Sequence, residues 1–264
     1  GTSVFCMPVH DKEQLYRHLQ DVMSREDFEE RIRAEVEAYG GLIDPATAAL
    51  VVVDKTKPHF FSSTTVGDLK PDTDATLYVA VDYVGDTRVF DRGRVVNIVV
   101  GDATGRCVLV LWDANVGLAE NSRMVPGQVL KVINGYVKNG YYGLEVNVGR
   151  WGVVDPAPPH PPRIEPSTST VPLLRAARGI VDVEATVREI APTRVYLTDK
   201  GESFAAVVRA ADSSGQRSIT LWNHLARDIQ GYAPGDRLRF RRLYVKDGEL
   251  HAGDISSLSP APSC

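Results

Sequence analysis

The sequence predicts a mainly β protein, in which two tandem five-stranded barrels follow a small helical N-terminal domain. Three observations predict this fold class. Residues from Thr76 onward form short β-branched runs broken by Gly, Asp and Asn, which is typical of strands joined by tight turns. The same blocks of sequence occur twice in the same order. Residues before Lys57 instead repeat their apolar side chains at helical spacing.

The N-terminal segment carries helix start and stop signals. Ser24 and Asp27 resemble a capping box, and Phe28 and Ile32 begin an apolar stripe at helical spacing. Asp44-Pro45 predicts a second helix, with an aspartate cap and a proline in the first turn. The acidic run at 26–37 is interpreted as the solvated face of the first helix, with a protein-binding surface as the alternative.

The internal repeat is the most informative feature of the chain. GDATGRCVLVLWD at 101–113 aligns with AADSSGQRSITLWN at 210–223, so that Trp112 corresponds to Trp222. The blocks TRVF at 87–90 and YVKNG at 136–140 recur as TRVY at 193–196 and YVKDG at 244–248. Because the blocks keep their order and nearly constant spacing, the sequence predicts two copies of one β domain.

Each copy has room for five strands, expected in the first copy at 76–84, 94–101, 107–113, 128–137 and 144–149. A helix or loop is expected between the third and fourth strands, and Asn139-Gly140 or Asp247-Gly248 predicts a hairpin after the fourth. This is the strand plan of the OB-fold, whose second and third strands and adjacent loops bind oligonucleotides. The predicted domains are 1–68 (helical), 69–154 (first OB-fold), 155–172 (a linker with seven prolines), 173–258 (second OB-fold) and 259–264 (tail).

The motifs GDATGRCVLVLWD and NGYVKNGYYGLEVNVGR resemble the DNA-binding domains of archaeal replication protein A, and EDFEERIRAEVEAYGG resembles its N-terminal segment. The resemblance covers most of the chain and is more specific in the first copy. It implies a cytoplasmic, nucleoid-associated protein that coats and protects single-stranded DNA in DNA replication, repair and recombination. It also implies partners among other replication protein A subunits or replication and repair proteins, which would bind through the helical domain.

Strand alternation predicts which aromatic side chains are available to DNA. Leu109 and Leu111 should share one face of their strand, and Trp112 should lie on the other. In the second copy Trp222 shares its face with Ser218 and Thr220, which indicates a solvent-exposed surface. A tryptophan on such a face suits base stacking, with core packing as the alternative. By resemblance, Tyr141 or Tyr142 supplies a second stacking ring in the first copy, and His251 is its weaker equivalent in the second.

Phosphate contacts require cations around these rings. Most of the candidates lie in the loops between the first and second strands or at strand ends. In the first copy they are Arg88, Arg92, Arg94, Arg106, Lys138 and Arg150, with Phe90 among them; in the second copy they are Arg194, Arg209 and Lys246, with Tyr196.

Other function classes find little support in the sequence. There is no Walker A motif, no H-E-x-x-H and no glycine-rich dinucleotide loop, so we expect no enzyme activity and no cofactor. The three cysteines are far apart, so we expect no metal site, a reducing compartment, and a core position for Cys107. No apolar run approaches the ~20 residues of a membrane span. Net charge is −4 overall, but the acidic excess lies mostly in residues 1–70. An RNA-binding protein, or an OB-fold used for protein docking or oligomerisation, stays open as an alternative.

Overall fold

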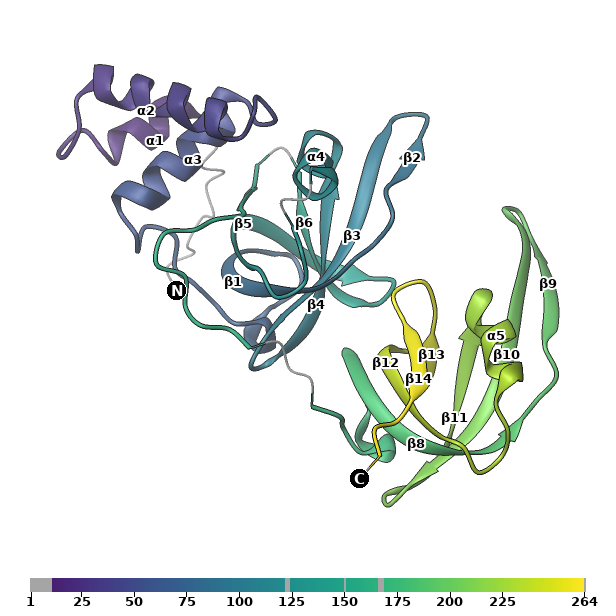
Figure 1. Ribbon diagram of the computed structural model, residues 1–264. Coiled ribbons are helices and arrows are strands. Elements are labelled where there is room, and N and C mark those ends of the chain that lie inside the picture. The colour runs from purple at the N-terminus through teal and green to yellow at the C-terminus, as the bar shows by residue number, and fades with distance from the viewer. Residues whose placement is uncertain (1–10, 122–123, 150, 166–168, 264) are drawn as a thin grey trace, which may run out of the picture.

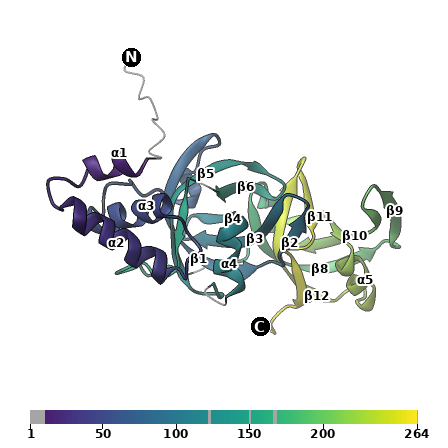
Figure 2. The ribbon, with the colours of Figure 1, turned by 90° about the horizontal axis from the view of Figure 1, so that it is seen from above.

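The computed structural model describes residues 11–121, 124–149, 151–165 and 169–263. Three helices lie against a first β-barrel, and a second β-barrel lies on its opposite side (Figure 1). A view from above shows the three parts in a row, in chain order (Figure 2). Within the described residues, no helix is long and apolar enough to cross a membrane.

The helices begin where the capping signals predict. Helix α2 starts after Ser24, whose side chain accepts a hydrogen bond from the backbone N–H of Asp27. Helix α3 starts after Asp44, which accepts one from the backbone N–H of Thr47. The helices span Lys12–Arg17 (α1), Arg25–Ala38 (α2) and Pro45–Thr56 (α3).

The first barrel closes in the order β1-β3-β4-β6-β5, because β5 pairs back onto β1. Strand β6 runs parallel to β4, and every other pairing in the ring is antiparallel. A short helix connects β4 to β5, and β2 forms a hairpin with β3. The elements are Thr73–Val84 (β1), Arg88–Phe90 (β2), Gly93–Asp102 (β3), Gly105–Trp112 (β4), Val116–Glu120 (α4), Val129–Gly140 (β5), Gly143–Val148 (β6) and Val153–Asp155 (β7).

The second barrel repeats this topology as β8-β10-β11-β13-β12, with β12 paired back onto β8. Two closed five-stranded barrels with this strand order are OB-folds, so the predicted fold class is confirmed. The elements are Ile180–Ile190 (β8), Arg194–Thr198 (β9), Gly201–Asp212 (β10), Gly215–Trp222 (β11), His224–Asp228 (α5), Arg237–Lys246 (β12), Glu249–Ala252 (β13) and Ser257–Pro260 (β14).

The repeated D-x-[TS]-G sequence has the same structural role in both barrels. Asp102 accepts hydrogen bonds from the backbone N–H of Thr104 and of Val66, both at 2.8 Å. Asp212 accepts equivalent bonds from Ser214 and Leu173, at 2.8 and 2.7 Å. Burial raises the pKa of Asp212, but these hydrogen bonds outweigh burial and leave the pKa below its usual value. Each aspartate therefore ties its turn to the 3₁₀ helix that precedes the first strand.

The hairpin between the fourth and fifth strands differs between the barrels. In the second barrel Asp247 and Gly248 form the turn, both with positive φ, as the sequence predicts. In the first barrel the strands stay paired through Gly140, so the turn falls two residues later, on Tyr141 and Tyr142. The expected Asn-Gly turn is therefore corrected, and the two tyrosines form the tip of the hairpin.

The helices share one continuous core with the first barrel. Phe28, Ile32 and Val51 are buried in the same cluster as the inward residues of the barrel strands. The hydroxyl of Tyr39 donates to the carbonyl of Val154 in β7, at 2.9 Å. A buried ion pair joins the two parts, with Lys131 of β5 2.6 Å from Asp54 of α3.

The two barrels contact each other through a third apolar cluster. It joins residues on the outer face of β3 and β4, including Val108 and Val110, to Ile180, Tyr244 and Ile255 of the second barrel. At the positions that correspond to Val108 and Val110, the second barrel has Ser218 and Thr220, which are not buried. On β4 and its counterpart β11, these two positions are therefore apolar only in the barrel whose face is covered.

Buried charges accompany this apolar contact. Arg106 of β4 lies 2.8 Å from Asp182 of β8 and 3.4 Å from Asp82 of β1. Asp182 also accepts the backbone N–H of Arg242, whose guanidinium lies over the ring of Tyr83 at 4.7 Å. These interactions fix how the second barrel sits on the first.

Candidate nucleic-acid interface

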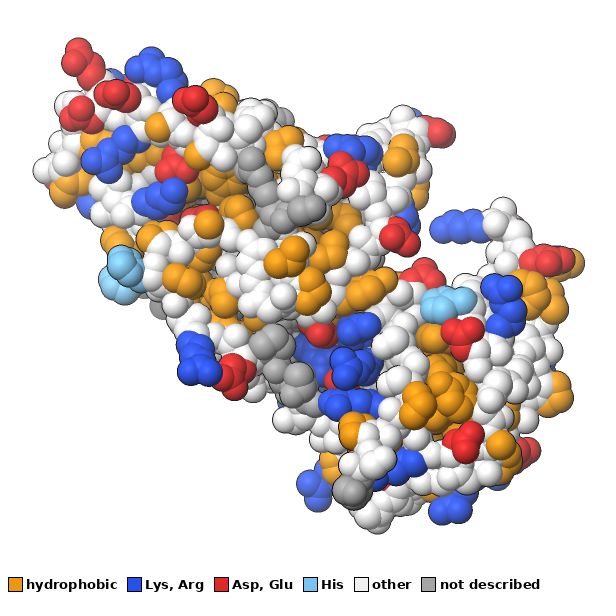
Figure 3. Space-filling view, in the orientation of Figure 1, with side chains coloured by type: hydrophobic (Ala, Val, Ile, Leu, Met, Phe, Trp, Pro, Cys, Tyr) orange, Lys and Arg blue, Asp and Glu red, His pale blue; other side chains and the backbone are white. Residues whose placement is uncertain are grey.

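A groove runs between the two barrels and has a volume of about 460 Å³. The first barrel lines it with the β2–β3 hairpin, the outer face of β3 and β4, and the Tyr141–Tyr142 tip, while the second contributes Lys200, Ser203 and Trp222. The space-filling view shows the surface hollowed between the β2–β3 and β9–β10 hairpins (Figure 3). The groove is therefore shared by both barrels.

Strand alternation places Trp112 at the open end of the first barrel's outer face. Leu109 and Leu111 are buried in the barrel core, whereas Trp112 is 38% exposed. The indole Nε1–H of Trp112 donates to Oδ1 of Asn147, at 3.1 Å. This hydrogen bond fixes the plane of the ring beside the groove, and the core-filling alternative for Trp112 is not what the structure shows.

A second groove of about 350 Å³ lies on the second barrel. Arg194, Tyr196, Thr220, Trp222 and His251 line it, and Trp222 also lines the groove between the barrels. The indole Nε1–H of Trp222 donates to Nδ1 of His251, at 3.1 Å. Burial lowers the pKa of His251, which favours the neutral imidazole that accepts this bond. The two grooves therefore adjoin at Trp222.

Aromatic rings connect the two barrels. The ring of His251 stacks on that of Trp222 and on that of Tyr244, with centroid distances of 6.3 and 5.6 Å. Tyr244 in turn contacts Tyr142 edge-on, at 4.9 Å. The row continues to Tyr141 at one end and to Tyr196 at the other. An aromatic path thus runs from one groove to the other.

The structure corrects the expected role of Tyr142. Its ring packs against Tyr244 in the contact between the barrels, and burial raises its pKa to about 12. Tyr142 therefore helps to join the barrels, and only part of its ring faces the groove. Tyr141 is 55% exposed, and Lys246 of the second barrel lies 4.1 Å from its ring centroid. Of the two tyrosines, Tyr141 is the more exposed.

The predicted phosphate-binding cations divide into those that form an ion pair with a carboxylate and those that do not. Arg106 is only 7% exposed and holds the two barrels together, so its predicted phosphate contact is corrected. Arg94 pairs with Glu120, Lys138 with Glu145, and Arg209 with Glu189. Arg150 lies outside the described residues. Among the described part of the chain, the predicted cations with no ion pair are Arg88, Arg92, Arg194 and Lys246.

Several groove residues were not predicted, and two of them come from the second barrel's long hairpin. Lys200 and Ser203 come from the β9–β10 hairpin of the second barrel and face the first barrel's groove. The signal for them lies in the contrast between Val108–Val110 and Ser218–Thr220, which indicates that the first barrel's face is covered. The contrast could have predicted that the barrels touch, although it could not have named the residues opposite.

The topology and the two aromatic grooves define a tandem OB-fold protein. The chain is 26% identical over 255 residues to Replication factor A of the archaeon Methanothermobacter thermautotrophicus, so the predicted resemblance is confirmed. The alignment covers 86% of this chain and 32% of the relative, so the chain spans about a third of the relative's length. No protein-family model matches the chain.

Solved structures are similar at a lower level. A replication protein A heterotrimer bound to single-stranded DNA is 14% identical, with a TM-score of 0.41, and the match covers 76% of this chain and 52% of that one. A murine DNA-binding protein bound to double-stranded DNA is 14% identical, with a TM-score of 0.46, covering 72% and 97%. A replication factor A related protein from Methanobacterium thermoautotrophicum is 20% identical, with a TM-score of 0.32, covering 35% and 88%.

Proposed function

We propose that this protein binds single-stranded DNA in the groove between its barrels and in the adjoining groove of the second barrel. The observation that carries the proposal is that exposed aromatic rings from both barrels line two grooves that meet at Trp222. Unpaired bases stack on such rings whatever their sequence, whereas bases paired inside a duplex cannot reach them.

The charges around the grooves support the same proposal. Arg88 lines the groove between the barrels together with Phe90, and Arg194 lines the second groove together with Tyr196. Cations beside stacking rings allow the bases to lie on the protein while the phosphates face the guanidinium groups. We infer a protein without catalytic function that coats and protects single-stranded DNA in replication, repair and recombination, in the cytoplasm at the nucleoid.

RNA is the nearest alternative ligand, because aromatic rings do not distinguish deoxyribose from ribose. Similarity to Replication factor A favours DNA. Competition of oligo-rU and of duplex DNA against labelled oligo-dT tests whether the protein prefers single-stranded DNA to RNA and to duplex. We expect both to compete poorly, and efficient competition by duplex of equal length would contradict stacking on unpaired bases.

Trp112→Ala and Arg92→Ala should weaken oligo-dT binding in different ways. Loss of the indole should cost ~1–3 kcal/mol at every salt concentration, because stacking does not depend on ions. If Arg92 contacts a phosphate, Arg92→Ala should cost less and flatten the log–log salt dependence by about 0.7. Fluorescence anisotropy from low to high salt separates the two effects.

Thermal unfolding of the same preparations is the control. The indole of Trp112 is partly exposed, so Trp112→Ala should leave the melting temperature close to that of the wild type. A large fall in melting temperature, with oligo-dT affinity restored on cooling, would assign Trp112 to the fold and contradict its role in the groove.

A further inference from the structure

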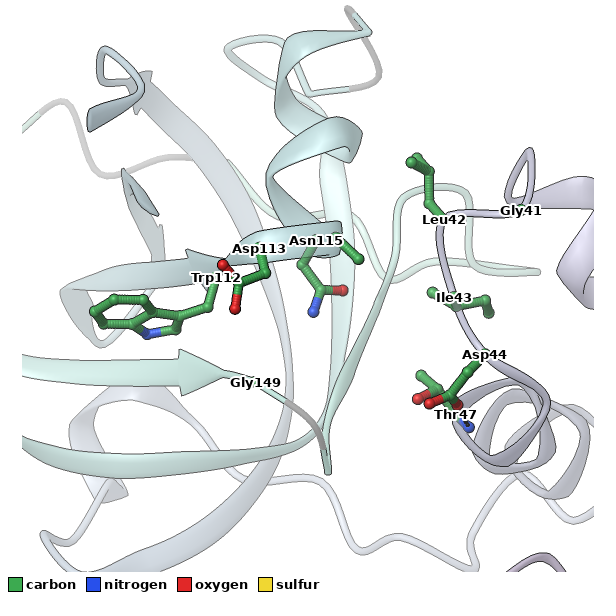
Figure 4. A pocket seen from close by; sticks show the side chains of 10 residues that line it. Gly41, Leu42, Ile43, Asp44, Thr47, Trp112, Asp113, Asn115 and Gly149 are labelled. Atoms are coloured by element: carbon green, nitrogen blue, oxygen red, sulfur yellow. Dashed lines mark hydrogen bonds between the residues drawn. The ribbon is translucent and has the colours of Figure 1, made fainter. Parts of the chain in front are cut away.

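A cavity of about 390 Å³ lies on the far side of Trp112, between the helices and the first barrel. The loop between α2 and α3, including Leu42 and Asp44, forms one wall, and Trp112, Asp113 and Asn115 form the other (Figure 4). Trp112 lines both this cavity and the groove between the barrels. The cavity and the groove therefore adjoin at Trp112.

The close approach of the two walls depends on Gly117. A Cβ at this position would lie 2.8 Å from a methyl group of Leu42, so a larger residue would force the Leu42 side chain to shift. The N-terminus of α3, with Asp44 and Thr47, completes the wall on the helical side. The cavity is therefore a product of the packing of the helices on the barrel.

Asn115 is the unexplained residue of this cavity. Its side chain is more than nine-tenths buried, yet its Oδ1 atom has no hydrogen-bond partner among the described residues. The amide extends into the space between Asp113 and Thr47 (Figure 4). A buried amide oxygen without a partner is destabilising, so a ligand that donates to it gains a hydrogen bond that the protein alone does not supply.

The segment that carries Asn115 is longer in the first barrel than in the second. Asp113–Asn115 separate β4 from α4, whereas Asn223 alone separates β11 from α5. Asp113 and Asn223 correspond, since their Oδ1 atoms accept the backbone N–H groups of Arg94 and Phe204. Asn115 therefore lies in a two-residue insertion that the second barrel lacks.

Two carboxylates share the cavity with Asn115. Asp44 uses Oδ1 to cap α3, and Asp113 uses Oδ1 to accept the backbone N–H of Arg94. In the described part of the chain their second oxygens have no recorded hydrogen bond. Acceptors therefore dominate the polar lining, which disfavours a phosphate and favours the edge of a base that carries N–H donors.

We propose that this cavity binds one nucleobase of the DNA strand, and that it prefers a base with an exocyclic amino group (cytosine, adenine or guanine) over thymine. The amino group donates to Asn115 Oδ1 or to a neighbouring carboxylate, and the base faces lie between Trp112 and the helical loop. Thymine has a carbonyl oxygen where cytosine has the amino group, so it offers these acceptors only its single N3–H donor. The proposal rests on the proposed binding of single-stranded DNA.

The test uses oligo-dT in which a single dC replaces dT at each position in turn. We expect one position at which dC binds at least about fivefold more tightly than dT. The matched probe carries pyrimidin-2-one at that position, which lacks the amino group and should lose the gain. An effect of dC that is the same at every position, or that pyrimidin-2-one retains, would overturn the proposal.

Asn115→Leu is the matched protein variant, because leucine is close to asparagine in size and has no hydrogen-bonding atom in its side chain. The variant should keep its melting temperature and should bind the dC-substituted strand no more tightly than oligo-dT. Asp44→Asn retains a helix cap and should weaken the same preference. A preference that survives Asn115→Leu would overturn the proposal. Failure of the wild type to bind oligo-dT at all would instead contradict the proposed function.

Discussion

Lys131→Ala is expected to destabilise the protein by about 3–5 kcal/mol, because it leaves the carboxylate of Asp54 buried without its cation. The ammonium group of Lys131 lies 2.6 Å from Asp54 and 5.0 Å from the ring centroid of Tyr78, and its side chain is only 4% exposed. The pair joins α3 to β5, so the helices and the first barrel should lose stability together. Urea unfolding followed by circular dichroism measures the change.

The matched control replaces both charges. Lys131→Met with Asp54→Leu removes the pair without leaving a buried charge, and such replacements are often neutral or stabilising. We therefore expect the double variant to recover most of the loss. A double variant as unstable as Lys131→Ala would show that shape at this site, and not the uncompensated charge, determines stability.

Arg106→Ala is expected to cost roughly 3 kcal/mol, at the low end for a broken buried pair, because Arg242 still faces Asp182 and Asp82. The loss should fall on the contact between the barrels, since Arg106 lies outside both barrel cores. Oligo-dT binding should weaken as well, because the groove needs both barrels in place. Calorimetry should show the unfolding of the two barrels becoming less cooperative.

Two further variants test whether the ion pairs of Arg106 cause the loss of stability. Arg106→Lys keeps the charge but cannot reproduce the planar guanidinium contact, so it should recover only part of the stability. Arg92→Ala removes an exposed arginine with no ion pair in the described structure and should leave calorimetry unchanged. Unaltered cooperativity in Arg106→Ala would contradict a role for this network in holding the barrels together.

Much of the fold could be predicted because its signals are local. Ser24 and Asp44 cap the helices that they predict, and Cys107 lies in the barrel core as expected. The repeat predicted the strand plan, because the same order of five strands had to fit both copies of the sequence. The alternation around Ser218 and Thr220 also predicted correctly which face of β11 is open.

The rest depended on contacts between parts distant in sequence. Arg106 and Tyr142 have the residue types of a DNA-binding surface, but the second barrel covers both. The Asn-Gly pair predicted a turn at 139–140, whereas pairing with β6 moved the turn to the tyrosines. The contrast between Val108–Val110 and Ser218–Thr220 indicates which face is covered, but no local pattern specifies the residues that pack against it, so these positions required the three-dimensional arrangement.

The central claim is that one DNA strand crosses both barrels through grooves that meet at Trp222. The most direct measurement is titration of oligo-dT, at lengths up to roughly 32 nucleotides, against the wild type, Trp112→Ala, Trp222→Ala and the double variant. A shared path predicts one strand per protein, a loss of ~1–3 kcal/mol for each single variant and nearly the sum for the double. Two strands per protein, with each variant abolishing one binding event and sparing the other, would contradict it.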